Sequence, residues 1–123
     1  MAAPPGKFTY VTYYLTIYIA VLYYISIIGS GVIRSFRHKG LEALFTTSSA
    51  RRVPAAWRPR IERMLDRLDS AARPQDMGVP GWRLHPLRGD KRDRWAVDVS
   101  GNLRLTFAFE GGHAVDVDLE DYH

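Results

Sequence analysis

Alternating apolar and polar residues in the C-terminal part of the chain place the strongest constraint on the fold. From Trp95 onward, apolar side chains recur at every second position, and short turn-forming segments interrupt the pattern. Successive side chains of a strand point to opposite faces of a sheet, so this period predicts strands with one buried face. The turns Ser100-Gly101-Asn102 and Gly111-Gly112 are short enough for hairpins. We therefore expect a largely antiparallel sheet with strands over 83–87, 95–99, 103–109 and 113–119.

Helical periodicity precedes the predicted sheet. Five apolar residues repeat at the spacing of one helical face, and three arginines lie off it as the expected solvent face: Ile61, Met64, Leu65, Leu68 and Ala72, and Arg60, Arg63 and Arg67. Pro54 is expected to open this helix and Pro59 to lie in or just after its first turn, where a missing N–H has no cost.

A shorter helix is predicted over 39–45, with Leu41, Leu44 and Phe45 on one face, and a short strand over 32–36. The expected order of an N-terminal strand, two helices and a mostly antiparallel sheet is an α+β fold. Its helices would cover one face of the sheet and leave the other free for a ligand.

Size and composition exclude several classes of site. A chain of 123 residues allows one domain with a modest core. It has no cysteine, so disulfides and thiolate metal sites are excluded. Its histidines, at positions 38, 85, 113 and 123, lack the i,i+4 spacing of metal ligands. We therefore expect no metal and no cofactor.

The charge is unevenly distributed. From Arg34 to Arg104, Lys and Arg outnumber Asp and Glu by eight, whereas Glu110 to Asp121 holds five acidic residues and no Lys or Arg. A basic, arginine-rich body predicts attraction to a polyanion, because guanidinium groups bind phosphate bidentately. A solvated arginine-rich surface from a GC-rich genome is the alternative. The acidic strand could contact a basic partner protein or limit nonspecific RNA binding.

The first 31 residues differ from the rest. No charged side chain lies between Lys7 and Arg34, and residues 8–28 are long enough to span the roughly 30 Å of a bilayer as a helix. Three interpretations stay open: a membrane anchor with a cytoplasmic C-terminal domain, a misassigned start with Val32 as the true start, or a hydrophobic arm that is buried or bound by a partner. The AT-rich codons of this stretch favour the misassigned start. We divide the chain into an extension, 1–31, and a domain, 32–123.

Residue types suited to phosphodiester cleavage gather near the C-terminus. Cleavage needs groups that move protons and cations that hold a phosphate. Histidine moves protons near neutral pH, and His85 and His123 lie with Tyr122 and several arginines on or beside the predicted strands. This set predicts a nuclease. A basic nucleic-acid-binding module without catalysis, possibly tethered to a membrane, is the alternative.

Five segments, in this order and spacing, resemble the HigB "killer" toxins of the RelE/ParE superfamily. The segments are Phe36-Arg37-His38-Lys39-Gly40-Leu41, Pro74-Gln75-Asp76-Met77, Pro80-Gly81-Trp82-Arg83-Leu84-His85-Pro86-Leu87-Arg88-Gly89-Asp90, Gly101-Asn102-Leu103-Arg104 and Glu120-Asp121-Tyr122-His123. The resemblance covers Val32 to His123 and implies a RelE-like fold. It also implies a cytoplasmic type II toxin that enters the ribosomal A site, cuts mRNA and inhibits growth.

The resemblance also implies partners. A cognate HigA-like antitoxin with a helix-turn-helix fold would hold the toxin inactive and repress the shared operon. Operator DNA would be contacted only through that complex. A membrane would be a partner only if residues 8–28 are truly translated.

The resemblance assigns roles to single residues. His85 and His123 are the expected acid/base pair, Asp121 orients a histidine or tunes its charge, and Tyr122 stacks on a base or lends its hydroxyl. The expected phosphate-binding residues are Arg104 first, then Arg88, Lys91 and Asn102, and no metal takes part. Many family members carry Lys where this chain has Arg88. Arginine cannot act as a general acid, so His85 would have to protonate the leaving group if that lysine does so elsewhere.

Overall fold

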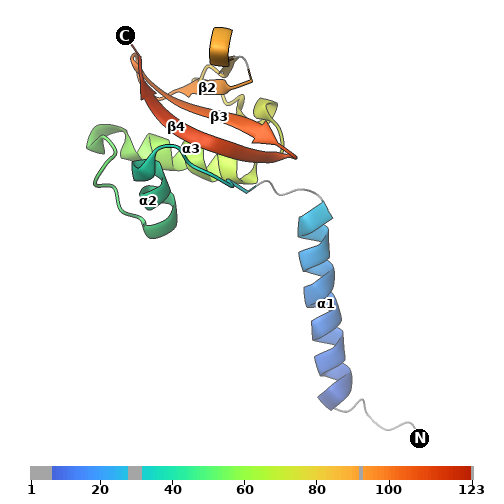
Figure 1. Ribbon diagram of the computed structural model, residues 1–123. Coiled ribbons are helices and arrows are strands. Elements are labelled where there is room, and N and C mark those ends of the chain that lie inside the picture. The colour runs from blue at the N-terminus through green and yellow to red at the C-terminus, as the bar shows by residue number, and fades with distance from the viewer. Residues whose placement is uncertain (1–6, 28–31, 92, 123) are drawn as a thin grey trace, which may run out of the picture. The chain divides into compact units, whose positions relative to one another are not determined.

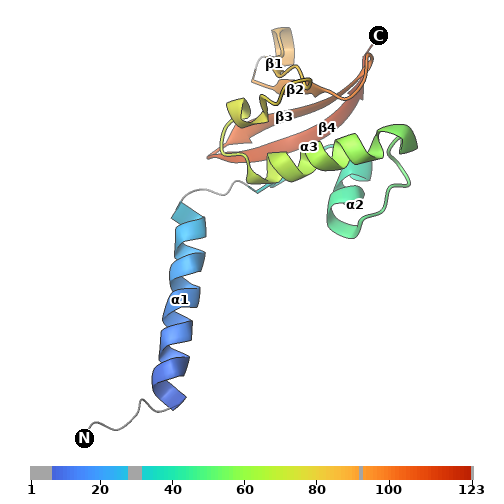
Figure 2. The same cartoon turned by 180° about the vertical axis from the view of Figure 1, so that it is seen from behind.

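The computed structural model of the protein describes residues 7–27, 32–91 and 93–122. The chain separates into two units, Met1–Ser30 and Gly31–His123 (Figures 1 and 2). The first unit holds helix α1 (Lys7–Ile27), whose residues 11–23 are all exposed. Within the described part of the chain, no helix is long and apolar enough to cross a bilayer.

The second unit has the α+β class that the sequence predicts, with helices before a four-stranded antiparallel sheet in the order β1-β2-β3-β4. Its helices are α2 (Lys39–Thr47) and α3 (Arg58–Ser70), with short 3-10 helices η1 (Ala55–Trp57), η2 (Pro74–Met77) and η3 (Gly89–Lys91). Its strands are β1 (His85–Pro86), β2 (Trp95–Asp98), β3 (Leu103–Glu110) and β4 (His113–Asp121).

Helices α2 and α3 lie against one face of the sheet, as both ribbon views show (Figures 1 and 2). The core between these layers includes Leu65 and Leu68 of α3 and Leu105 and Phe107 of β3, all almost fully buried. The expected burial of Ala72 is wrong. Helix α3 ends at Ser70 and the chain becomes extended, so Ala71 is buried in its place.

The helix starts follow local chemistry. His38 is the N-cap of α2, and its Nδ1 accepts a hydrogen bond from the Leu41 N–H at 3.1 Å. Helix α3 begins at Arg58 rather than at Pro54, which precedes the 3-10 turn η1 instead. Pro59 lies in the first turn of α3, where its missing N–H leaves no hydrogen bond unmade.

The predicted N-terminal strand over 32–36 is not formed. In its place stand two isolated parallel bridges to β4, from Ile33 to Ala114 and from Phe36 to Val117. Between these bridges β4 is irregular. Asp116 has a φ of +51°, and its N–H donates a hydrogen bond to the hydroxyl oxygen of Ser35 at 2.8 Å. A side chain thus takes the place of a backbone partner, and no continuous ladder forms.

Candidate active site

The strand register defines the composition of the sheet face opposite the helices. Residues directly opposite one another in antiparallel strands point to the same face, and so do residues two positions apart. His85 pairs with Ala96, Ala96 with Thr106, and Thr106 with Asp118. Two residues further along β2, Asp98 pairs with Arg104, and Arg104 in turn pairs with Glu120. We call this surface the polar face: His85, Ala96, Asp98, Arg104, Thr106, Asp118 and Glu120.

An open cleft of about 480 Å³ lies at one end of the polar face. Its lining residues are Arg83, Leu84, His85, Asp98, Gly101 and Tyr122. Two of the residues expected to act in catalysis, His85 and Tyr122, are therefore brought to one site although they lie far apart in the sequence. Asp98 and Arg83, which sequence reasoning did not select, complete the cleft.

The imidazole of His85 is held in one orientation. Its Nδ1 lies 2.7 Å from the carbonyl oxygen of Arg83. A carbonyl oxygen can only accept a hydrogen bond, so Nδ1 must carry the proton, and Nε2 of the neutral ring is then an acceptor. Arg83 has a φ of +54°, a conformation that residues other than glycine seldom adopt.

The segment that carries Arg83 is fastened to β2 and α3. The Asp98 N–H donates to the Trp82 carbonyl at 2.7 Å. The Arg60 guanidinium of α3 donates to the carbonyls of Gly81 at 2.9 Å and Asp98 at 3.0 Å. The expectation that Arg60 belongs to the solvent face is therefore wrong: this side chain ties the helix layer to the edge of the cleft.

Tyr122 is held at its hydroxyl and at its ring face. Its hydroxyl donates to Oδ1 of Asp98 at 3.4 Å. The guanidinium carbon of Arg104 lies 4.3 Å from the ring centroid, a cation–π distance. The register of Arg104 directs its side chain away from the core, and its position places a cation beside the cleft.

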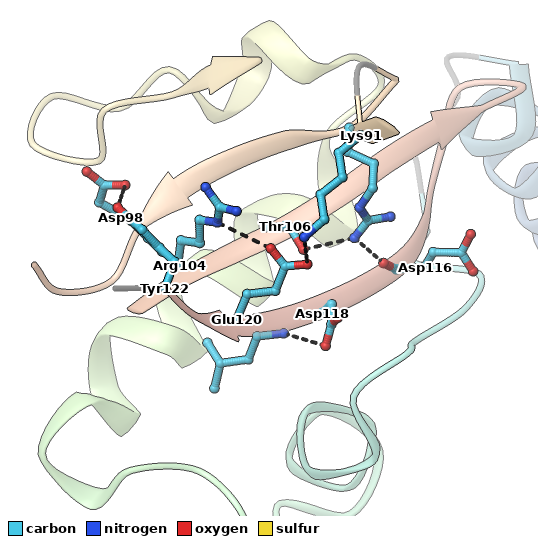
Figure 3. A network of polar contacts seen from close by, with 10 residues as sticks. Lys91, Asp98, Arg104, Thr106, Asp116, Asp118, Glu120 and Tyr122 are labelled. Atoms are coloured by element: carbon cyan, nitrogen blue, oxygen red, sulfur yellow. Dashed lines mark hydrogen bonds and ion pairs between the residues drawn. The ribbon is translucent and has the colours of Figure 1, made fainter. Parts of the chain in front are cut away.

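Glu120 lies between two of the expected phosphate-binding cations (Figure 3). Its Oε1 accepts from Lys91 Nζ at 3.0 Å, and its Oε2 accepts from Arg104 Nε at 3.2 Å. Burial alone would raise the pKa of the Glu120 carboxyl, but the Lys91 ammonium and the Arg104 guanidinium outweigh burial and lower that pKa. The site therefore has an ionised carboxylate that fixes two cations.

A buried arginine lies beside this cluster. The Nη2 of Arg94, the residue directly before β2, donates to the Thr106 hydroxyl of β3 at 2.9 Å and to the Asp116 carbonyl of β4 at 2.7 Å. Burial lowers the pKa of the Arg94 guanidinium, and the charge of Arg37 acts in the same direction. Within the described residues its Nε and Nη1 have no hydrogen-bond partner. No local sequence signal distinguishes this arginine from the exposed ones.

The remaining predicted site residues differ in their surroundings. Asn102 Nδ2 donates to Asp121 Oδ1 at 3.2 Å, and its carbonyl accepts from the Tyr122 N–H at 2.8 Å, so Asn102 joins the β2–β3 turn to the end of β4. Arg88 is exposed, and its guanidinium makes no hydrogen bond or ion pair with any described residue. His123 lies outside the described residues.

The described residues contain no group of three or more His, Cys, Asp or Glu that could hold a metal ion.

The two other histidines have structural contacts. His38 caps α2, and His113 Nδ1 accepts a long hydrogen bond from the Val32 N–H at 3.5 Å. Neither residue lines the cleft. His85 is therefore the only one of the three described histidines that lines it.

An α+β unit with a polar sheet face and a histidine–tyrosine–arginine cleft agrees with one family of toxins. Residues 34–123 match the family described as the RelE-like toxin of type II toxin–antitoxin system HigB, so the chain belongs to the HigB-like toxins. A curated relative, the "Endoribonuclease HigB" of Proteus vulgaris, is 39% identical over 92 residues. The matched stretch is 75% of this chain and all of the relative. The resemblance drawn from the five sequence segments is confirmed.

Proposed function

We propose that this HigB-like toxin is an endoribonuclease that cleaves translated mRNA in the ribosomal A site, with side chains rather than a metal ion as the catalytic groups. The family and the endoribonuclease relative support an RNA-cleaving toxin. The observation that carries the catalytic part is the shared cleft of His85 and Tyr122, beside which Arg104 is fixed. Phosphodiester cleavage needs a proton acceptor and a cation at one place, and this cleft supplies both.

RNA carries its own nucleophile in the 2′-hydroxyl. His85 Nε2 is free to take the proton of that hydroxyl because Nδ1–H is bound to the Arg83 carbonyl. The 2′-oxygen then attacks the phosphorus, the bond to the 5′-oxygen breaks, and a 2′,3′-cyclic phosphate is left on one fragment. A general acid must return a proton to the 5′-oxygen, and His123 is our candidate for that step.

Guanidinium groups would offset the extra negative charge on phosphorus. Arg104 suits this task because its side chain is only 17% exposed and is oriented by Glu120 on one side and by the Tyr122 ring on another. Preorganised charge stabilises a transition state without reorganisation at the moment of reaction. Arg88, with no partner among the described residues, is the second candidate, and Lys91 could follow the backbone of the RNA.

A type II toxin has a cognate antitoxin and, here, an RNA substrate. We propose that the antitoxin is a HigA-like helix-turn-helix protein, that it represses the shared operon, and that the toxin contacts operator DNA only in the complex. We also propose that the toxin acts in the cytoplasm. Asp121 remains the proposed residue for orienting or tuning a histidine.

Cleavage on programmed ribosomes tests the proposal. The full chain is incubated with ribosomes that carry mRNA and an A-site codon, and cuts are mapped by primer extension. We expect cuts within that codon, and His85→Ala should lower the rate by about 100-fold, the lower range for loss of a general base. His113→Ala is the matched control, because His113 is outside the cleft.

Two further results would contradict the proposal. Loss of cleavage with 1,10-phenanthroline, which removes transition metals and leaves ribosomal magnesium in place, would rule out side chains as the sole catalytic groups. RNA binding without cuts, or cuts unchanged by His85→Ala, would favour the nucleic-acid-binding alternative.

A further inference from the structure

We propose that Asp98 is a positioning residue for RNA cleavage, and that it acts by holding the hydroxyl of Tyr122 in the cleft. The inference rests on the proposed function and extends it to a residue of β2 that no sequence motif selects. Three observations carry it: the place of Asp98 on the polar face, its contact with Tyr122, and its connection to the segment that presents His85.

Asp98 is the last residue of β2 and lies directly opposite Arg104. It is two positions from Ala96, which pairs with His85, so Asp98 and His85 share a face of the sheet. Its side chain is 17% exposed and lines the same cleft as His85 and Tyr122. A carboxylate in this position is costly unless it is hydrogen-bonded or paired.

The contact with Tyr122 indicates what this carboxylate does in the cleft. Tyr122 follows the last residue of β4 and lies outside the strand, so the orientation of its side chain depends on the contacts that the side chain makes. The Arg104 guanidinium contacts the face of the ring, and Asp98 Oδ1 accepts from the hydroxyl at 3.4 Å. The first contact holds the plane of the ring, and the second holds its outer end. Together they leave one orientation from which Tyr122 can meet a base or a phosphate.

Asp98 also links Tyr122 to the other wall of the cleft. Its Oδ2 lies 3.6 Å from Arg83 Nε, and its N–H donates to the Trp82 carbonyl at 2.7 Å. The Arg83 side chain is 83% exposed, so the ion pair contributes little, and the backbone hydrogen bond is the firmer link. A change of the Asp98 side chain therefore acts mainly on Tyr122 and leaves the segment that carries His85 attached.

A double-mutant cycle tests this inference in the full chain. Single-turnover cleavage on programmed ribosomes is compared for wild type, Asp98→Ala, Tyr122→Phe and the double variant, because alanine removes the oxygen that accepts from the Tyr122 hydroxyl. We expect each single variant to cleave roughly tenfold more slowly, a loss within the range of coupling between contacting residues. The double variant should be no slower than Tyr122→Phe, because the hydroxyl that Asp98 holds is already gone.

Asp118→Ala is the matched control. Asp118 shares the polar face, but its carboxylate accepts from the N–H of Leu119, the next residue, and it does not line the cleft. This control should cleave at the wild-type rate.

Several outcomes would overturn the inference. If Asp98→Ala slows cleavage by the same factor in the Tyr122→Phe background as in wild type, Asp98 acts by another route, general loss of stability included. Wild-type rates for Asp98→Ala or for Tyr122→Phe would also overturn it. These results leave the proposed function standing when wild type still cleaves. No cleavage by wild type would contradict the proposed function itself, and the role of Asp98 would fall with it.

Discussion

The guanidinium of Arg104 lies over the ring of Tyr122, with its carbon 4.3 Å from the ring centroid, while its Nε donates to Glu120 at 3.2 Å. One cation is thereby held by the ring of Tyr122, which follows the last residue of β4, and by the carboxylate of Glu120 within β4. Lysine could provide the charge at this position but not the planar, delocalised group that stacks on a ring and donates sideways.

Replacing Arg104 by lysine should therefore slow cleavage despite the conserved charge. We expect a loss of roughly 100-fold for Arg104→Lys and at least as much for Arg104→Ala, comparable to the removal of one preorganised donor to an oxyanion. Single-turnover rates on programmed ribosomes provide the measurement. Arg63→Ala is the control, because Arg63 is exposed on α3 and makes no hydrogen bond or ion pair within the described residues. Equal rates for wild type and Arg104→Lys would show that charge alone suffices.

His38→Ala should weaken the fold without affecting the chemistry. Its imidazole caps α2 by accepting from the Leu41 N–H, and loss of an N-cap costs about 1 kcal/mol of stability. Chemical denaturation should show a lower midpoint with an unchanged slope. The cleavage rate per folded molecule should stay at the wild-type value. A large fall in that rate would place His38 in the function, contrary to its position outside the cleft.

The Glu120 carboxylate should make the free energy of unfolding depend on pH in the acidic range. Burial opposes its ionisation, but Lys91 and Arg104 outweigh burial, and its pKa in the folded state is lowered. Protons therefore bind it more tightly in the unfolded chain. The stabilisation is fully present above the pKa of the unfolded chain and is lost as the pH falls through the lower, folded value. We expect the free energy of unfolding to decrease below about pH 4.

The variant Glu120→Gln isolates this contribution. It should be less stable than wild type near neutral pH, and the difference should shrink as the pH falls below about 4. Thermal melts at a series of pH values measure it. A difference in stability between wild type and Glu120→Gln that stays constant over that pH range would show that Glu120 remains ionised throughout, or that the carboxylate does not stabilise the fold.

Removal of residues 1–31 should leave the toxin domain intact. The chain separates at this point into two units, and the family match begins at residue 34. The described side chains of α1, at residues 11–23, are exposed. A chain that starts at Val32 should melt at the same temperature and cleave at the same rate as the full chain. A lower melting temperature would support the hypothesis of a hydrophobic arm that is buried against the domain.

The role of the acidic residues of β4 could not be predicted from composition. Its charges suggest a surface for a basic partner or a means to limit RNA binding. In the structure, Glu120 pairs with Lys91 and Arg104, and Asp116 lies 3.8 Å from Arg37. These carboxylates thus serve as counterions inside the domain. Composition shows that the charges exist, but the distance between opposite charges depends on the pairing of strands.

Apart from the strand expected over 32–36, local sequence did predict the main helices and strands of the domain and the faces they bury. Alternation from Trp95 onward predicted strands whose apolar residues, such as Leu105 and Phe107, are buried, and the helical spacing around Leu65 predicted α3. These patterns can be read from the sequence because each depends on neighbours within a few positions. Likewise, the family segments predicted His85 and Tyr122 as site residues because five short segments, taken together in their order and spacing, resemble the family.

Which residues meet across strands was decided only by the tertiary structure. The partner of Asp98 depends on the length of the β2–β3 turn, and the buried contacts of Arg94 depend on the irregular backbone at Asp116. A shift of one residue in register would turn each of these side chains to the other face of the sheet. No local pattern records that register, because it results from the summed packing of all four strands against the helices. The composition of the strands was therefore determined by the sequence, and the constellation of Asp98, Arg104, Glu120 and Tyr122 by the fold.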